Sequence, residues 1–172
     1  MLIRPATPAD LASITAIYTH HVNHGTGSFE LEAPDLAEMS SRFASITTAG
    51  FPYLVAEAQG EVLGYAYANH FRTRPAYRFT VEDSIYVAPH AQGRGVGRAL
   101  LERLIEECTA AGCRQMLAVI GDSANAGSIA VHRACGFVDC GTVKSVGWKF
   151  DGWRDIVFMQ RALGEGDATI PA

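Results

Sequence analysis

The segment Gln92-Gly93-Arg94-Gly95-Val96-Gly97 constrains the fold of this chain more than any other, because of what flanks it. Residues 79–87 before it are rich in β-branched and aromatic side chains and predict a strand, and residues 98–108 after it predict a helix. Glycines allow positive φ and let a ligand approach the backbone closely. The first turn of the helix then offers free N–H groups and the positive end of the helix dipole. The segment therefore predicts a site for an anionic, phosphate-bearing ligand.

The spacing of these glycines narrows the kind of ligand. It does not match the Gly-x-x-x-x-Gly-Lys-Ser/Thr pattern of nucleotide P-loops or the Gly-x-Gly-x-x-Gly pattern of dinucleotide-binding folds. The observed pattern, Gln-x-x-Gly-x-Gly, resembles the acetyl-CoA pyrophosphate loop of GNAT-type N-acetyltransferases. For the hexapeptide alone, a tight glycine turn that holds no ligand is the alternative interpretation.

The length and composition of the chain indicate a globular protein with one domain. Of its 172 residues, 48% are hydrophobic and 19% are charged, which excludes a disordered chain. We expect a single domain over residues 1–163 and a flexible tail over 164–172. The net charge of −4 and the lack of a long basic run argue against nucleic acid as a partner. No signal region or membrane-length apolar run is evident, so a membrane partner is not expected.

The four cysteines, Cys108, Cys113, Cys135 and Cys140, include no Cys-x-x-Cys pair. A zinc site is therefore not expected, and neither is a metal bound by His132 with the last two of these cysteines. Free thiols fit the reducing conditions of the cytoplasm, which is the location we expect.

Hydrophobic periodicity predicts a mixed α/β (α+β) fold. Strands are expected at residues 2–4, 53–57, 62–67, 79–87, 115–120, 137–146 and 153–161. Helices are expected to begin at residues 7–10 and 34–35 and to span 98–108 and 125–133. The apolar helix positions are Leu11, Ile14, Ile17 and Tyr18, then Leu36, Met39 and Phe43, then Leu100, Leu101, Leu104, Ile105 and Cys108. The first helix is expected to end in an exposed polar turn at His20–Gly25, where histidines suit the helix dipole better than a metal.

Three further segments resemble the GNAT family in the right order, and the resemblance covers nearly the whole chain. Val81–Val87 stands where that family has its central strand, Asn125–His132 matches its second acetyl-CoA segment, and Cys135-Gly136-Phe137 matches the Gly-Phe that follows. The resemblance implies a central, mostly antiparallel sheet that is splayed at the acetyl-CoA site and flanked by helices.

A narrower resemblance is to the phosphinothricin and methionine sulfoximine (or sulfone) N-acetyltransferase branch. It is carried by residues 53–57, 74–77, 80–82, 86–87, 118–121 and 149–155. This implies transfer of acetyl from acetyl-CoA to the α-amine of a small amino-acid analogue by a homodimer. Two alternatives remain at this point. One is acetylation of another amine, such as a peptide N-terminus or a polyamine, and the other is a non-catalytic acyl-CoA-binding sensor.

The resemblance also implies which residues bind acetyl-CoA, and it makes the backbone N–H of Val87 a donor to the acetyl oxygen. The expected acetyl-CoA-binding residues are Ile85, Tyr86, Val87, Gln92, Gly93, Arg94, Gly95, Val96, Gly97, Arg98, Asn125 and Ser128.

Glu82 and His132 are the candidate catalytic residues. An amine must lose a proton before it can attack a thioester, and a carboxylate in a partly dry pocket, such as that of Glu82, suits this task. Glu82 alternatively only orients the ammonium. His132 lies seven residues from Asn125, about two helical turns, so both should face one channel, where His132 would protonate the departing thiolate. The alternative for His132 is a ring packed beside Phe137.

The acceptor is expected to carry a carboxylate, which guanidinium groups bind in a two-pronged way. The expected substrate-binding residues are Arg72, Thr73, Arg74, Glu82, Asp83 and Ser84. Arg74 best matches the family position, although all these arginines could be surface residues of a loop. Asp83 follows Glu82 directly, so a regular strand would point it to the other face of the sheet. Phe29, Tyr77 and Trp148 are candidates for the pocket wall, with core packing as the alternative for each.

Overall fold

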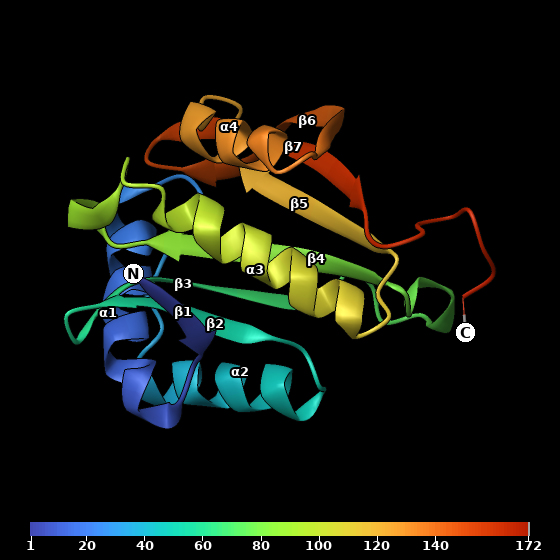
Figure 1. The fold of residues 1–172 in the computed structure, drawn as a ribbon. Coiled ribbons are helices and arrows are strands. Elements are labelled where there is room, and N and C mark those ends of the chain that lie inside the picture. The colour runs from blue at the N-terminus through green and yellow to red at the C-terminus, as the bar shows by residue number, and fades with distance from the viewer. Residues whose placement is uncertain (172) are drawn as a thin grey trace.

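The computed structural model describes residues 1–171 and contains seven strands and four α-helices, so the expected mixed α/β class is confirmed (Figure 1). In chain order the elements are β1 (Leu2–Pro5), α1 (Leu11–His24), α2 (Leu36–Thr48), β2 (Tyr53–Ala58), β3 (Glu61–His70), β4 (Thr80–Val87), α3 (Val96–Ala110), β5 (Gln115–Gly121), α4 (Ala126–Ala134), β6 (Val138–Lys149) and β7 (Gly152–Ala162).

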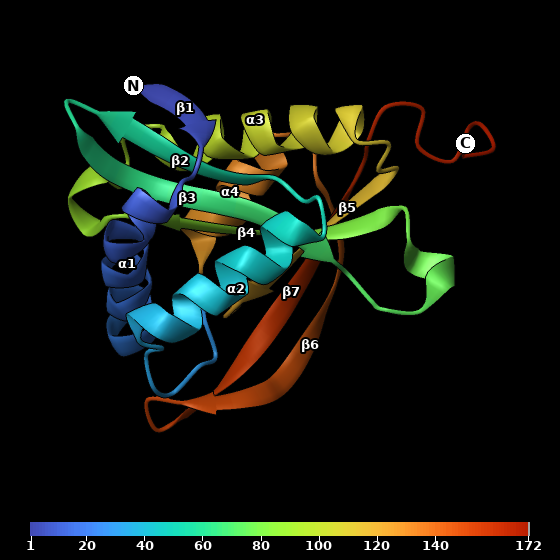
Figure 2. The same ribbon diagram turned by 90° about the horizontal axis from the view of Figure 1, so that it is seen from below.

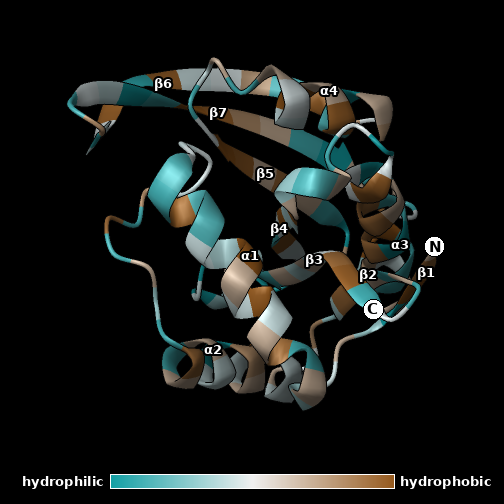
Figure 3. Cartoon of the chain, turned by 90° about the vertical axis from the view of Figure 1, so that its left-hand side faces the viewer, coloured by the Kyte–Doolittle hydropathy of each residue, from teal (hydrophilic) through white to brown (hydrophobic). Residues whose placement is uncertain are grey.

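The strands form one sheet in the order β1-β2-β3-β4-β5-β7-β6. Every neighbouring pair is antiparallel except β4 and β5, which run parallel. Helices α3 and α4 cover one face of the sheet, while α1 and α2 cover the other (Figures 1 and 2). Hydrophobic and hydrophilic residues alternate along α1 and α2 (Figure 3), as expected of amphipathic helices that cover a sheet.

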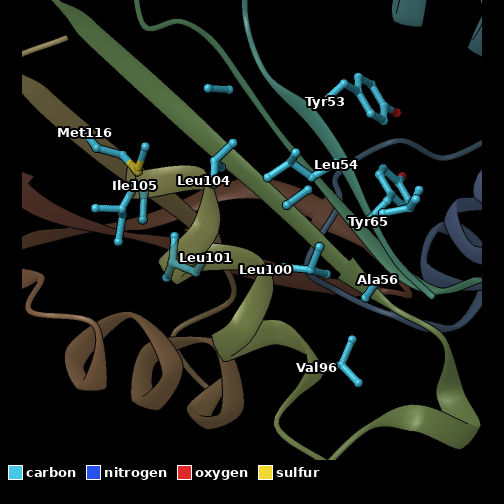
Figure 4. Close-up of a cluster of buried hydrophobic side chains, with 14 of the residues drawn as sticks. Tyr53, Leu54, Ala56, Tyr65, Val96, Leu100, Leu101, Leu104, Ile105 and Met116 are labelled. Atoms are coloured by element: carbon cyan, nitrogen blue, oxygen red, sulfur yellow. The ribbon is translucent and has the colours of Figure 1, made fainter. Parts of the chain in front are cut away.

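The main core lies between α3 and the sheet. All five apolar positions predicted on α3 are buried, and they pack near Leu54, Ala56 and Met116 of the sheet (Figure 4). Burying each large aliphatic side chain stabilises the fold by roughly 1.5–3 kcal/mol relative to leaving it exposed. Because α3 is anchored along its whole length, its N-terminus is held in a fixed place at the end of β4.

Two sequence predictions about the first two helices need correction. The first helix does not end in an exposed turn at residue 20 but continues to His24, because Val22 is buried against the core and His21 is partly buried. Leu36, predicted as a core position of α2, is 49% exposed because it lies in the first turn of that helix.

The sheet opens between β4 and β5. Their ladder ends at the pair Asp83 and Ala118, whereas β4 remains paired with β3 as far as Val87 and β5 remains paired with β7 as far as Gly121. The two strands therefore diverge beyond residue 83 (Figure 1), which is the splay that the family resemblance implied. One backbone edge of residues 84–87 is left without a neighbouring strand.

Residues 164–171 follow β7 as turns that contact the body of the protein. Arg114 donates hydrogen bonds to the carbonyl oxygen of Gly166 and to the Thr169 hydroxyl, at 3.3 and 3.0 Å. Residue 172, the last of the expected flexible tail, lies outside the described residues. None of the helices within residues 1–171 has the length and apolar character needed to cross a membrane.

Candidate functional site

A cavity of about 810 Å³ occupies the opening between β4 and β5. This volume is in the range of cofactor and ligand sites. It is lined by β4, the glycine loop, the N-terminus of α3, the end of β5, α4 and the loop between α1 and α2. The cavity brings together most of the predicted site residues, namely Glu82, Asp83, Ser84, Ile85, Tyr86, Val87, Gln92, Gly93, Gly95, Val96, Gly97, Arg98, Asn125, Ser128 and His132. Arg94 is exposed and does not line it.

The glycine loop has the backbone geometry of an anion site. Gly93 and Gly95 have φ of 71° and 81°, and Gly95 caps α3, which begins at Val96. No atom outside the neighbouring residues lies within 4 Å of a Cβ built on either glycine, so both face open space. The first turn of α3 carries no acidic residue, so its N–H groups and the helix dipole remain available to an anion.

The open edge of β4 presents backbone groups to the cavity. The N–H of Ala88 donates to the carbonyl of Leu63 in β3 at 2.8 Å. Because antiparallel strands direct alternate residues to alternate neighbours, the N–H and C=O of Val87 face the gap instead. The carbonyl of Val87 accepts a 2.8 Å hydrogen bond from Nε2 of His21 in α1. An extended ligand arm along this edge would therefore meet the N–H of Val87.

His21 was missed as a site residue because the sequence offers no sign of its contact with Val87, 66 residues away. It lines the cavity and packs against the ring of Tyr86. Burial lowers the pKa of His21, and the hydrogen bond to Val87 opposes this only in part. The ring is therefore neutral near pH 7 and uses its Nε2–H as the donor.

Glu82 lies half-buried on the face of the sheet that α1 and α2 cover. It shares that face with Ser84 and Tyr86, and the ring of Tyr86 packs edge-on against Tyr18 of α1. Burial raises the pKa of Glu82, the negative charge of Asp83 raises it further, and the charge of Arg72 lowers it in part. A carboxylate with a raised pKa is a better proton acceptor near neutral pH, as base catalysis needs.

Asp83 and His132 meet on the opposite face, so the alternation expected for residues 82 and 83 is confirmed. Nε2 of His132 lies 2.9 Å from Oδ2 of Asp83, and Nδ1 lies 2.8 Å from the Ser128 carbonyl oxygen. His132 as a whole is 4% exposed, and its ring packs edge-on against Phe137, with ring centroids 5.1 Å apart. Among the described residues, Oδ1 of Asp83 is buried without a hydrogen-bond partner. Spacing along the chain could not reveal this pair, since its members lie 49 residues apart.

Asn125 has a clear structural part in building this wall. Its side-chain oxygen accepts a hydrogen bond from the N–H of Ser128 at 3.2 Å and so caps α4, which begins one residue later than predicted. The cap fixes the start of the helix that carries Ser128 and His132 to the cavity.

Three of the six predicted substrate-binding residues do not line the cavity. Arg72, Thr73 and Arg74 are exposed in the loop between β3 and β4. Of these, Arg72 is close enough to Glu82 for its charge to act on that carboxyl, and its guanidinium lies over the ring of Phe71. Phe29 does line the cavity, whereas Tyr77 and Trp148 are exposed and do not.

The loop between α1 and α2 forms one wall of the cavity and is held from β6. Buried Lys149 donates from Nζ to the carbonyl oxygen of Ser28 at 2.6 Å. Gly147 faces the ring of Phe29, and a Cβ at this position would overlap that ring. Glycine at 147 is therefore needed for the wall to pack, a role that sequence analysis missed.

In the described part of the chain, no group of three or more His, Cys, Asp and Glu side chains could hold a metal ion.

Comparison with known proteins agrees with this geometry. The model of the acetyltransferase (GNAT) family matches residues 15–137. The chain is 56% identical over 169 residues to a phosphinothricin N-acetyltransferase of Alcaligenes faecalis, covering 98% of this chain and 86% of that protein. It is 41% identical to an L-methionine sulfoximine/L-methionine sulfone acetyltransferase of Salmonella typhimurium, covering 96% of each.

The fold is also found in a crystal structure of a GNAT superfamily phosphinothricin acetyltransferase from Sinorhizobium meliloti in complex with acetyl-CoA. The TM-score is 0.97 at 53% identity, and the match covers 99% of this chain and 92% of that one. Together with the splayed sheet, the glycine loop and the cavity between them, these similarities establish that the chain belongs to the GNAT family of acetyltransferases.

Proposed function

We propose that this acetyltransferase moves the acetyl group of acetyl-CoA to the α-amine of a small amino-acid analogue, of the phosphinothricin, methionine sulfoximine or methionine sulfone class. The observation that carries the proposal is the opening between β4 and β5, which joins the glycine loop and Glu82 in one cavity. The names of the relatives support the acceptor class.

The residues fit acetyl-CoA at three places. The glycine loop and the first turn of α3 would hold the pyrophosphate through backbone N–H groups. The open edge of residues 84–87 would pair with the extended pantetheine arm. The N–H of Val87 would stabilise the negative charge that develops on the thioester oxygen.

Glu82 would take a proton from the acceptor ammonium, directly or through a water. The freed amine then forms a C–N bond to the thioester carbon as the C–S bond breaks. The nitrogen gives up two protons in total; in the net reaction the departing sulfur gains one proton and solvent gains the other. His132 is the candidate that protonates the sulfur, since it stands on the α4 wall of the same cavity.

Release of free thiol from acetyl-CoA tests this function directly. The enzyme should release thiol on addition of phosphinothricin or methionine sulfone, and much more slowly with a polyamine or a peptide. Faster turnover of the peptide or polyamine would contradict the acceptor class. Binding of acetyl-CoA without turnover of any amine would support a sensor instead.

Mutation can distinguish the roles of two arginines in the loop between β3 and β4, Arg72 and Arg74. If Arg74 binds the acceptor carboxylate, Arg74→Ala should raise the KM for methionine sulfone about ten- to a hundred-fold, as expected for a lost charged hydrogen bond. Arg72→Ala should raise the pKa of Glu82, because the charge of Arg72 lowers the pKa of this carboxyl in the wild type. Arg78→Ala is the matched control, since Arg78 is exposed in the same loop with its guanidinium over Phe79. Equal KM values for the Arg74 and Arg78 variants would remove Arg74 from acceptor binding.

We also propose that residues 1–163 act as one domain in a cytoplasmic homodimer. The hairpin of β6 and β7 exposes apolar side chains that a second copy would cover, including Trp148, Phe150 and Trp153, which are 54%, 50% and 63% exposed. The cysteines are free within the described residues, in keeping with a reducing compartment. Light scattering of the wild type and of Trp153→Arg tests the dimer, which should dissociate in the variant.

A further inference from the structure

The hydrogen bonds around His132 determine where its protons lie. Nδ1 faces the backbone carbonyl of Ser128, which can only accept, so Nδ1 must carry a hydrogen. Nε2 is 2.9 Å from Oδ2 of Asp83, a distance that also requires a hydrogen between the two atoms. The pair therefore holds one proton more than a neutral imidazole beside a carboxylate. This conclusion follows from the identity of the two acceptors and their distances from the ring nitrogens.

The surroundings make Asp83 the group that keeps this proton in place. Its side chain is 2% exposed and that of His132 is 5% exposed, so water screens their interaction little. Burial acts to lower the pKa of His132, but the hydrogen bond and the charge of Asp83 outweigh it, and the net pKa is raised.

Other titratable groups near the pair do not compete for this role. Glu82 points to the other face of the sheet. The pKa of the Cys108 thiol is raised, mainly by a hydrogen bond with Cys113, and the pKa of the Cys135 thiol is raised mainly by burial. The charge of Asp83 raises the pKa of both thiols further. Both thiols are therefore neutral. The charged side chains of α3 and α4 nearby form exposed ion pairs, namely Arg98 with Glu102 and Arg133 with Asp139.

A path leads from this proton to the cavity. The hydroxyl oxygen of Ser128 lies 3.4 Å from Nδ1 of His132, on the side of the ring opposite Asp83. Ser128 is partly exposed and lines the cavity, as do Asp83 and His132. The three side chains thus form a row, Asp83 Oδ2 to His132 Nε2 and His132 Nδ1 to Ser128 Oγ, that ends at the cavity.

We propose that Asp83 is a positioning residue for acetyl transfer, which orients His132 and keeps it protonated so that Ser128 can relay the proton to the departing sulfur. As the C–S bond breaks, the Ser128 hydroxyl gives its hydrogen to the thiolate and takes the hydrogen of Nδ1. The imidazole left behind regains a proton from solvent after the products leave. This inference rests on the proposed function, because it needs a thiolate to be formed in the cavity.

Asp83→Asn tests the proposal, since it removes the charge at nearly constant shape. Burial of His132 is then no longer opposed by the charge of Asp83, so the pKa of His132 should fall from its raised wild-type value. NMR titration of the His132 ring measures this without any turnover. The decline of kcat at alkaline pH should move to lower pH by a similar amount, with little change in the KM for acetyl-CoA.

The matched control is Asp139→Asn, which removes an exposed carboxylate near the same helix and should move neither the titration nor the pH profile. Asp83→Glu should recover part of the raised pKa of His132 that Asp83→Asn loses. Ser128→Ala should lower kcat without changing the titration of His132. An unchanged alkaline limb in Asp83→Asn would overturn the proposal. If that variant does not fold, titration of the wild type alone tests the proposal. A His132 ring that is neutral at pH 6.5 would contradict the extra proton assigned to the pair of Asp83 and His132. Lack of turnover by the wild type would instead count against the proposed function.

Discussion

The positive φ of Gly95 offers the sharpest test of the acetyl-CoA loop. Gly95→Ala adds a Cβ that meets no protein atom within 4 Å, so any effect on the stability of the free protein must come from the backbone conformation, in which φ is 81°. Gly60, in the turn between β2 and β3, has φ of 80° and equally open surroundings, but it does not line the cavity. Replacement by alanine should lower the free energy of unfolding by about 1–2 kcal/mol at either position.

Only Gly95→Ala should weaken acetyl-CoA binding. Relief of the strained φ would turn backbone N–H groups of the loop away from the pyrophosphate. Each charge-assisted hydrogen bond lost in this way is worth roughly 1.5–3 kcal/mol, or about ten- to a hundred-fold in Kd. Calorimetry gives the Kd and denaturant unfolding gives the stability of both variants. If both variants lose the same stability and both bind acetyl-CoA like the wild type, the assignment of the loop is refuted.

Three further outcomes follow from the geometry. Glu82→Gln should lower kcat about 10²- to 10⁴-fold and should abolish the rise of the rate as the pH passes through the raised pKa of Glu82. Calorimetry should find the affinity for acetyl-CoA unchanged, and an unchanged pH profile would exclude Glu82 as the catalytic base. Gly147→Ala should displace Phe29, cost about 1–3 kcal/mol of stability and raise the KM of the acceptor more than that of acetyl-CoA, so equal effects on both would contradict the assigned wall. Hydrogen bonds from Arg4 lower the pKa of Asp10 to about 2 from 3.8, so its stabilisation is present above pH 3.8 and is lost as the pH falls to about 2; acid unfolding of Asp10→Asn should lack this component.

Local signals in the sequence were sufficient for most of the fold. The strand at 79–87, the glycine loop and the helix after it were recognisable because alternation, positive-φ glycines and helical periodicity depend on neighbouring residues. The expectation that Glu82 and Asp83 face opposite sides followed from strand geometry in the same way. Errors arose where packing overrode local preference, as at His20–Gly25, where burial of Val22 extends α1.

The order of residues along the chain is enough to show which chemical groups are available: an anion-binding loop, a carboxylate on the central strand, and a histidine on the helix that Asn125 caps. Tertiary structure alone decided which of them meet. Contacts between Asp83 and His132, His21 and Val87, and Lys149 and Ser28 join residues 49, 66 and 121 positions apart. Such pairs depend on how helices lie on the two faces of the sheet and on where β4 and β5 diverge. Periodicity indicates which side of an element faces the core, but it does not indicate which residues of other elements contact that side.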